Sequence, residues 1–367
     1  MDKKVGIITF QESNNFGAMY QAYGLQTAIE ELGYTPEIID YHCIAKEAQY
    51  SNRFSKDRTI LQNINVMLSF GIYKQSRIKF DLFREKYLLL SECKYDKRQL
   101  NGLNSCYDAF VCGSDQIWNP DSVKDDGTFF LDFVSNVDKK IPYAPSIGIT
   151  VISEEYRDLW IKYFNNFVTL SVREQSGATV IEQMTGRKAQ VVLDPTLLIS
   201  KKKWESILEP RVYEKPYILL YNLDYTPAMV DFAKRASKET GLPVLLPVRT
   251  IRDYKDGFKC YVWSPQEFLS AIYGAEYVIT NTYHGMIMSV IFHKKLIMFD
   301  KKCSKNATGK RMDDFLNMVN LSHRKSDGSL KILSEDIDYD KVDLRLEEEK
   351  KRSLTYLKES IKKAVDE

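Results

Sequence analysis

The sequence predicts a protein of two doubly wound α/β domains that face each other. The chain has 367 residues, which is more than one hydrophobic core usually covers. Patterns typical of a strand, a helix and a strand follow one another within residues 5–41, and a second alternating series begins after residue 200. Two such series indicate two parallel sheets flanked by helices, with a boundary near residues 195–215.

The first series opens with an apolar strand at residues 5–10 and a polar, glycine-containing loop. A helical pattern starts near Phe16, because Leu25, Ile29 and Leu32 fall on one face of a helix. The next strand covers residues 36–41. A strand, a helix and a strand within about 40 residues form a βαβ unit, in which the strands are parallel and the crossover is right-handed.

We expect residues 1–200 to form the first domain, residues 201–346 the second, and residues 347–367 a C-terminal helix. Residues 45–105 are polar and rich in lysine, which indicates a helical insertion with helices near 57–70 and 74–89. Further strands are expected at residues 108–112, 142–146, 167–172, 190–193, 217–223, 243–248, 277–280 and 296–299, and further helices at 154–165, 175–186, 226–239, 265–274 and 283–292.

The composition argues against several classes of protein. The chain has 44% hydrophobic and 28% charged residues, as folded proteins do. Its 52 basic and 50 acidic side chains nearly cancel, so nucleic acid is not expected as a partner. Six scattered cysteines form no CxxC pair, and no apolar stretch reaches the roughly 20 residues of a membrane helix. We therefore expect a cytoplasmic protein without a signal peptide.

Polar segments follow four of the expected strands. In open parallel sheets, ligands bind beyond the carboxyl ends of the strands, so these segments are candidates for one site. The first and second segments contain Asn14, Asn15, Gly17, Gly113, Ser114, Asp115, Gln116, Trp118 and Asn119, and the third and fourth contain Arg173, Glu174, Asn281, Thr282, Tyr283, His284 and Gly285.

The same segments carry a resemblance to a known family. Residues 113–119, Gly-Ser-Asp-Gln-Ile-Trp-Asn, resemble the GSDQxWN motif of the polysaccharide pyruvyl transferases. Residues 8–23 resemble the opening motif of that family, residues 171–177 its SxREx-SG motif, and residues 193–196 and 282–285 two further motifs. The motifs occur in order over about residues 5–320, which covers most of the chain.

The resemblance implies two Rossmann-like domains arranged as in GT-B glycosyltransferases, with the C-terminal helix at residues 347–367 returning to the first domain. It also implies that phosphoenolpyruvate is the donor and that a pair of sugar hydroxyls on a surface polysaccharide, or on its lipid-linked precursor, is the acceptor. Peripheral association with the inner face of the membrane is a further implication. No cofactor or metal is expected beyond the phosphoenolpyruvate co-substrate, because the four histidines show no metal-ligand spacing.

Ketal formation from an enol phosphate needs an anion clamp, a general acid and a general base. Arg173 offers a planar fork for the phosphate or the carboxylate. The helix opening at His284 and Gly285 offers backbone N–H groups to an anion, and His284 is suited to carry a proton. Asp115 is placed to accept a proton from the sugar hydroxyl, or to hold that hydroxyl by a hydrogen bond.

Each of these residues also has a structural interpretation. Asp115 could be a helix N-cap, Arg173 an ion-pair partner of Glu174 or Asp194, and His284 a capping or core residue. Trp118 and Tyr283 could stack on sugar or pack in the core. The dipeptide at residues 194–195 is typical of a turn that ends a strand, and Cys112 of a small core residue.

One position departs from the family pattern. Some members have arginine two residues before the motif histidine, where this chain has Thr282. Lys310 or Arg311 could supply the missing charge from a later helix. The alternatives to a pyruvyl transferase are a GT-B glycosyltransferase that uses a nucleotide sugar and an inactive sugar-binding module.

Overall fold

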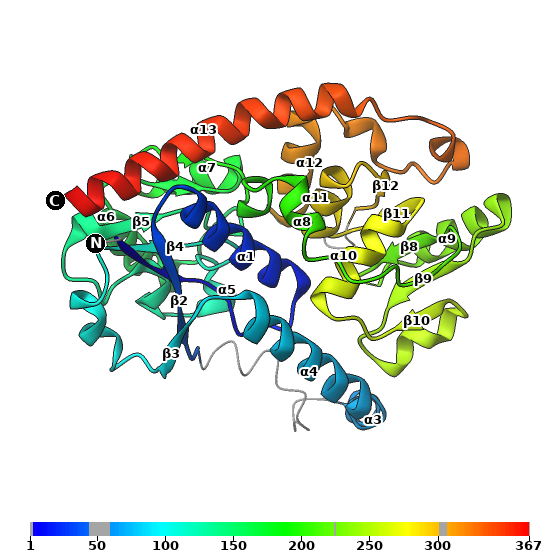
Figure 1. The fold of residues 1–367 in the computed structure, drawn as a ribbon, viewed down its shortest axis with the longest axis horizontal. Helices are drawn as coiled ribbons and strands as arrows, with labels where there is room; N and C mark the ends of the chain where they lie inside the picture. The colour runs from blue at the N-terminus through cyan, green and yellow to red at the C-terminus, as the bar shows by residue number, and fades with distance from the viewer. Residues whose placement is uncertain (1–2, 44–58, 224, 301–306, 367) are drawn as a thin grey trace.

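A computed structural model describes residues 3–43, 59–223, 225–300 and 307–366, with the side chains of residues 307–309 left out. Two five-stranded parallel sheets dominate it, and they lie side by side in Figure 1. Their strand orders are β3-β2-β1-β4-β5 and β10-β9-β8-β11-β12, which is the same pattern twice. The predicted α/β fold of two Rossmann-like domains is confirmed.

The central strands of the first sheet are buried. Residues 5–8 of β1 and all of β4 are buried, as expected for strands covered by helices on both faces. Residue pairing runs from Val5 opposite Ala109 to Ile8 opposite Cys112. The strands are β1 (Lys4–Ile8), β2 (Thr35–Tyr41), β3 (Leu90–Tyr95), β4 (Ala109–Cys112) and β5 (Lys140–Pro142).

Helix α1 (Phe16–Glu31) begins immediately after the loop that follows β1. The side chain of Asn15 caps it by accepting hydrogen bonds from the backbone N–H groups of Gly17 and Ala18. The helix reaches the second half of the molecule, because the Tyr20 hydroxyl donates to the carbonyl of Pro265 at 2.8 Å. The loop before α1 therefore lies at the boundary between the two halves.

The second sheet repeats the architecture of the first. Its strands are β8 (Ile218–Tyr221), β9 (Val244–Pro247), β10 (Lys259–Tyr261), β11 (Tyr277–Thr280) and β12 (Lys295–Met298). Its helices are α9 (Pro227–Thr240), α10 (Pro265–Gly274) and α11 (Tyr283–Ile291), followed by α12 (Ala307–Met318).

A small two-stranded sheet stands beside the first. It consists of β6 (Ser171–Val172) and β7 (Gln190–Val191), shorter than the strands expected at residues 167–172 and 190–193. Between them lies α7 (Gln175–Thr185), and α6 (Glu154–Asn165) precedes them. Two short helices, α5 (Pro120–Val123) and α8 (Lys201–Glu205), complete this half.

The expected helical insertion at residues 45–105 is partly wrong. Its helices are α3 (Ile60–Leu68) and α4 (Phe70–Tyr87), while residues 44–58 lie outside the described residues. The insertion also contains β3, which the prediction missed, as it missed β10 in the other sheet. Both are edge strands: β3 has only Ser91 buried and β10 has no buried residue, so neither shows an apolar pattern. The strand expected at 142–146 is instead β5, which ends at Pro142.

Helix α13 (Tyr339–Asp366) runs along both halves in Figure 1 and is longer than the helix expected at residues 347–367. Near its start, the Tyr339 hydroxyl donates to the carbonyl of Lys294 beside the second sheet. Further along, Ser353 Oγ accepts from the Leu193 N–H at 2.9 Å, and the Tyr356 hydroxyl donates to the Pro142 carbonyl at 3.2 Å. No helix among the described residues combines the length and the apolar character needed to cross a bilayer. The boundary near residues 195–215 stays a prediction.

Candidate functional site

Charged side chains from both halves meet beyond the carboxyl ends of β4 and β11, one from each five-stranded sheet, and of β6 and β7 in the small sheet. From the first half come Asp115 after β4, Arg173 after β6 and Asp194 after β7. From the second half come His284 on α11 and Arg311 on α12. Residues that follow strands lie close together because the parallel strands of one sheet all end at the same edge of that sheet.

Asp194 lies at the centre of the cluster and is fully buried. Its Oδ2 is 2.6 Å from Arg173 Nη1 and 3.4 Å from His284 Nε2. Its Oδ1 accepts hydrogen bonds from Thr196 N–H at 3.0 Å and Thr196 Oγ1 at 2.7 Å. Burial alone raises the pKa of this carboxyl, but His284 and Arg173 outweigh burial and hold the pKa well below its usual range. The negative charge of Asp194 thus holds the side chains of Arg173 and His284 in place.

Arg173 has more hydrogen-bonding capacity than its described neighbours use. Its side chain is buried, and its Nε and Nη2 have no hydrogen-bond partner among the described residues. These atoms lie 3.8 Å from Glu174 Oε2 and 3.8 Å from Asp115 Oδ1, respectively, beyond hydrogen-bond distance. Buried donors left without partners cost free energy, so they indicate a place for a ligand.

Arg311 is a second buried guanidinium in the same place. Its Nε and Nη1 also lack hydrogen-bond partners among the residues described. Tyr283 lies between the two cations: its ring centroid is 4.6 Å from Arg173 Cζ and 5.2 Å from Arg311 Cζ. Burial and the neighbouring Arg173 lower the pKa of Arg311. An anion bound here would offset the repulsion between the two guanidinium groups.

Lys310, the other expected source of charge, is exposed. Successive residues on a helix point about 100° apart, so α12 directs only one of the two side chains inward. The structure brings Arg311 to the site and leaves Lys310 outside it.

The imidazole of His284 lies against the start of α1, in the other half of the molecule. A Cβ atom added to Gly17 would be only 2.0 Å from His284 Nδ1. Glycine at this position therefore leaves the space that the ring occupies. His284 is held on two sides by the first half, through Gly17 and Asp194.

The expectation that Gly285 offers a free N–H to an anion is wrong. Thr282 Oγ1 accepts a hydrogen bond from this N–H at 3.1 Å, which caps α11. Thr280 Oγ1 lies 2.9 Å from Thr282 Oγ1 and extends this network. Thr282 is thus a helix cap, and it occupies the N–H of Gly285.

The loop after β4 places Asp115 at the edge of the cluster. Gly113 has a φ of +149°, and a Cβ there would lie 1.8 Å from the Tyr143 carbonyl oxygen. Asp115 has a φ of +63°, and its Oδ1 accepts from the Gln116 N–H at 2.9 Å. The N-cap of helix α5 is Asn119, which replaces the interpretation of Asp115 as a cap. Asp115 is partly exposed and faces Arg173.

Glu174 supplies a third carboxylate, beside Asp194 and Asp115. Its Oε1 accepts from Ser146 Oγ at 2.8 Å, while its buried Oε2 has no hydrogen-bond partner among the described residues. The site therefore presents acidic and basic groups within one small volume, as proton transfer beside a bound anion requires.

Other expected site residues support the loops instead of pointing at the cluster. Asn14 Oδ1 accepts from Arg84 Nη2 at 2.7 Å, and Asn281 Oδ1 accepts from the Leu223 N–H at 3.2 Å. Ser114 is an exception: its Oγ donates to the Ala144 carbonyl at 2.8 Å and also lies 3.5 Å from Asp194 Oδ2 in the cluster. Trp118 is fully buried and stacks on Phe130, so of its two interpretations the structure fits packing. The remaining residues of this kind are Gln116 and Asn119, which bond to each other.

Sequence reasoning underestimated Asp194, which it interpreted as part of a turn. The residue does shape that turn through Thr196, but it also joins Arg173 to His284. Its position after a strand, at the same edge as the other polar segments, was the available signal.

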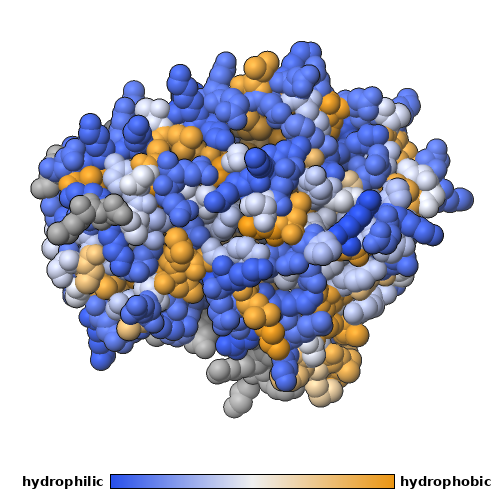
Figure 2. Space-filling view, in the orientation of Figure 1, coloured by the Kyte–Doolittle hydropathy of each residue, from blue (hydrophilic) through white to orange (hydrophobic). Residues whose placement is uncertain are grey.

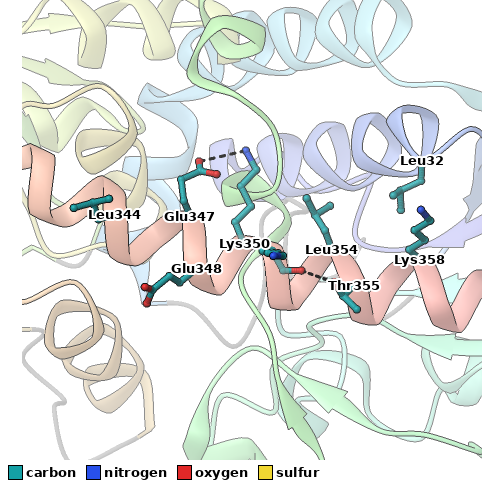
Figure 3. A pocket seen from close by; sticks show the side chains of 9 residues that line it. Leu32, Leu344, Glu347, Glu348, Lys350, Leu354, Thr355 and Lys358 are labelled. Carbon is teal, nitrogen blue, oxygen red and sulfur yellow. Dashed lines mark hydrogen bonds and ion pairs between the residues drawn. The ribbon is translucent and has the colours of Figure 1, made fainter.

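A groove of about 610 Å³ lies elsewhere, along α13 near the end of α1. Figure 3 shows Leu354 and Lys358 on α13, with Leu32, at the end of α1, opposite them. Its rim also carries the ion pair between Glu347 and Lys350. None of the clustered residues lines this groove.

The fold and the cluster define a class of protein: two Rossmann-like domains with a buried cluster of charged side chains, two guanidinium groups among them, where the domains meet. The sequence profile of the family described as polysaccharide pyruvyl transferase matches residues 15–301, so the chain belongs to that family. It is accordingly an enzyme that modifies polysaccharide. No curated protein matches the chain.

Solved structures resemble the chain in fold alone. The N-terminal domain of trehalose-6-phosphate phosphatase from Candida albicans has 10% identity and a TM-score of 0.50, covering 99% of this chain and 97% of that one. Arabidopsis thaliana UGT89C1, complexed with quercetin, has 12% identity and a TM-score of 0.49, covering 98% and 100%. Heptosyltransferase WaaC from E. coli has 12% identity and a TM-score of 0.42, covering 94% and 99%.

Proposed function

We propose that the chain transfers pyruvate from phosphoenolpyruvate to two hydroxyl groups of a sugar, forming a ketal on a polysaccharide or its lipid-linked precursor. The observation that carries this proposal is the pair of buried guanidinium groups with unpartnered donors, Arg173 and Arg311, beside His284. Membership of the pyruvyl transferase family supports the same reaction.

The charges of the site suit this donor. Phosphoenolpyruvate carries a phosphate and a carboxylate, and the two guanidinium groups flanking Tyr283 match two anionic groups. Arg173 is fixed by Asp194 through Nη1, so its Nε and Nη2 are held in position before the donor arrives. Such preorganisation lowers the entropy lost on binding.

The reaction begins with transfer of a proton to the methylene carbon of the donor. That carbon becomes a methyl group, and the adjacent carbon gains oxocarbenium character. A sugar hydroxyl adds to this carbon and loses its proton. The bond between carbon and the phosphate oxygen then breaks, the second hydroxyl closes the ketal, and its proton leaves with inorganic phosphate.

His284 is the proposed proton donor, because its Nε2 lies in the cluster and Asp194 orients it. Asp115 is the proposed acceptor of the hydroxyl proton, since it is partly exposed at the rim where a sugar can approach. Arg173 and Arg311 stabilise the negative charge that accumulates on the leaving phosphate.

Release of inorganic phosphate tests the proposal. The purified chain is incubated with phosphoenolpyruvate and a panel of hexose-containing glycans, and phosphate and ketal are measured. We expect phosphate release that depends on both the donor and a glycan acceptor. Binding of a nucleotide sugar without binding of phosphoenolpyruvate would instead identify a glycosyltransferase, and binding of glycan alone an inactive sugar-binding module.

A further inference from the structure

Helix α3 exposes an unusual amount of apolar surface. Its nine residues, Ile60–Leu68, include no charged side chain. Ile60, Leu61, Met67, Leu68 and the adjacent Phe70 have 56–80% of their surface exposed. Scattered apolar residues are normal on protein surfaces, but a contiguous group of this kind marks an interaction site.

The apolar surface continues onto a short segment of the second half, η5 (Ile251–Asp256). The backbone N–H of Ile251 donates to Ser69 Oγ at 2.9 Å, which joins the segment to the end of α3. Ile251 and Tyr254 are both exposed. We call the seven residues the α3 tip: Ile60, Leu61, Met67, Leu68, Phe70, Ile251 and Tyr254. Figure 2 shows hydrophobic side chains gathered at the lower right, where α3 lies.

Basic side chains border the α3 tip. Lys74 and Arg77 on α4 are exposed, as are Arg252 and Lys255 on η5. Of the four, Arg77 has an acidic neighbour, Asp81, at 3.8 Å.

Three of the four acidic groups on α4 and η5 are already engaged, and the fourth, Glu85, is exposed near the far end of α4. Asp253 Oδ2 accepts hydrogen bonds from the backbone N–H groups of Arg249 and Thr250. Asp256 pairs with Lys234 at 3.4 Å, and Asp81 pairs with Arg84 at 3.2 Å. The border of the α3 tip is therefore predominantly positive.

We propose that the α3 tip docks on an anionic phospholipid surface. An uncharged apolar centre with a basic border is the arrangement that binds the interface of a bilayer, where apolar side chains enter the acyl region and basic side chains meet anionic headgroups. A second copy of the chain fits less well, because self-association would bring two basic borders together.

Helix α4 connects the α3 tip to the candidate site. Phe80 stacks on Phe16, the first residue of α1, with ring centroids 5.2 Å apart. Arg84 Nη2 donates to Asn14 Oδ1 at 2.7 Å in the loop before α1. The 18 residues of α4 extend about 27 Å. A docked tip would hold the site about one helix length from the bilayer, within reach of a lipid-linked glycan.

Vesicle flotation with the full chain tests the docking, and it does not depend on the donor or on activity. Vesicles of phosphatidylcholine alone are compared with vesicles that contain 30% phosphatidylglycerol. We expect the wild type to float with the anionic vesicles and to release in high salt. We expect the double variant Leu61→Asp/Phe70→Asp to bind roughly tenfold more weakly, because it places two charges in the apolar centre.

Val151→Asp is the matched control, since Val151 is a 76% exposed apolar residue in a loop outside the α3 tip. This variant should float like the wild type, whereas Lys74→Glu/Arg252→Glu should weaken binding to anionic vesicles only. Failure of the wild type to float overturns the proposal, and so does equal loss in the Val151→Asp control. A dimer in size-exclusion chromatography that Leu61→Asp/Phe70→Asp converts to a monomer, without vesicle binding, assigns the surface to a second copy instead.

Discussion

The two five-stranded sheets of the molecule share a strand order, but the halves that contain them supply different charged groups to the site. The first half supplies the acidic groups Asp115, Glu174 and Asp194, together with Arg173. The second half supplies His284 and Arg311. Arg173 and Asp194 pair within the first half, whereas His284 reaches Asp194 across the boundary.

The two halves therefore have different roles in the site, although they share a topology. The first half contains a framework, the ion pair of Arg173 and Asp194, whose two side chains hold each other in place without the second half. The second half adds groups that become fixed only when the halves meet. Substitutions in the framework should therefore damage folding and activity together, while substitutions of the added groups should affect activity or donor binding alone.

Asp194→Asn should have the largest effect, because one change releases both Arg173 and His284. We expect turnover to fall at least as far as in a variant without His284. The free energy of unfolding should fall by about 3–5 kcal/mol, as when one member of a buried ion pair is lost. Activity assays and chemical denaturation at neutral pH measure the two effects.

The difference in free energy of unfolding between wild type and Asp194→Asn should depend on pH. The folded-state pKa of Asp194 is depressed, so its ionised form stabilises the fold above the unfolded pKa of about 3.9. This contribution is lost as pH falls below that value. The gap between wild type and Asp194→Asn should therefore shrink below about pH 4, and a constant gap from pH 7 to pH 3 would contradict the ionised pair.

His284→Ala should reduce turnover by about 10²–10⁴-fold, the usual contribution of a general acid or base. Thermal stability and donor binding should change little, because the residue is added to the framework and is not part of it. His284→Asn separates proton transfer from hydrogen bonding. Full activity in the Asn variant would mean that the proton comes from another group.

Arg173→Lys should weaken phosphoenolpyruvate binding by roughly ten- to hundredfold, equivalent to about 1.5–3 kcal/mol. Lysine keeps the charge but loses the planar fork that pairs with Asp194 and leaves Nε and Nη2 for the donor. Titration calorimetry with the folded variant measures this. Unchanged affinity would assign the anion to Arg311 alone.

Arg311→Met should weaken donor binding by about tenfold. It should not lower thermal stability, because a buried cation with unpartnered nitrogens contributes little to the stability of the protein without its ligand. Lys310→Met is the matched control on the same helix. It removes an exposed charge and should leave donor affinity unchanged. Equal losses in the two variants would indicate a general charge effect.

Chelation should have the smallest effect, none at all on the initial rate. The described residues contain no group of three or more His, Cys, Asp or Glu side chains arranged to hold a metal. Dialysis against EDTA and re-addition of Mg²⁺ or Mn²⁺ check this. Loss of activity that metal restores would contradict a mechanism based on side chains alone.

The fold could be predicted from sequence where strands are buried on both faces. Residues 277–280 and 265–274 were placed correctly, because an apolar run and a capped helix leave clear patterns. The edge strands β3 and β10 could not be found, since exposed edges carry polar residues without alternation.

The site was predictable in position more than in detail. The rule of strand ends brought Arg173 and His284 together correctly, but the choice between Lys310 and Arg311 depends on how α12 packs against the other half. The occupation of the Gly285 N–H by Thr282 is a matter of local side-chain geometry, which residue types alone do not determine. The role of Asp194 in the site was missed because a turn at the end of a strand already accounted for an aspartate before a proline.

Helix α13 also limits how the two halves can move. Its 28 residues span about 42 Å as one rigid element, attached near Tyr339 to one half and near Tyr356 to the other. The halves cannot draw apart along this helix without breaking those contacts. The edge opposite α13, where α4 lies in Figure 1, is tied as well, because Lys79 on α4 pairs with Glu267 at 2.6 Å and Ser69 Oγ accepts from the Ile251 N–H at 2.9 Å. Any opening that admits a glycan at this edge should therefore break these two links while α13 keeps the halves together.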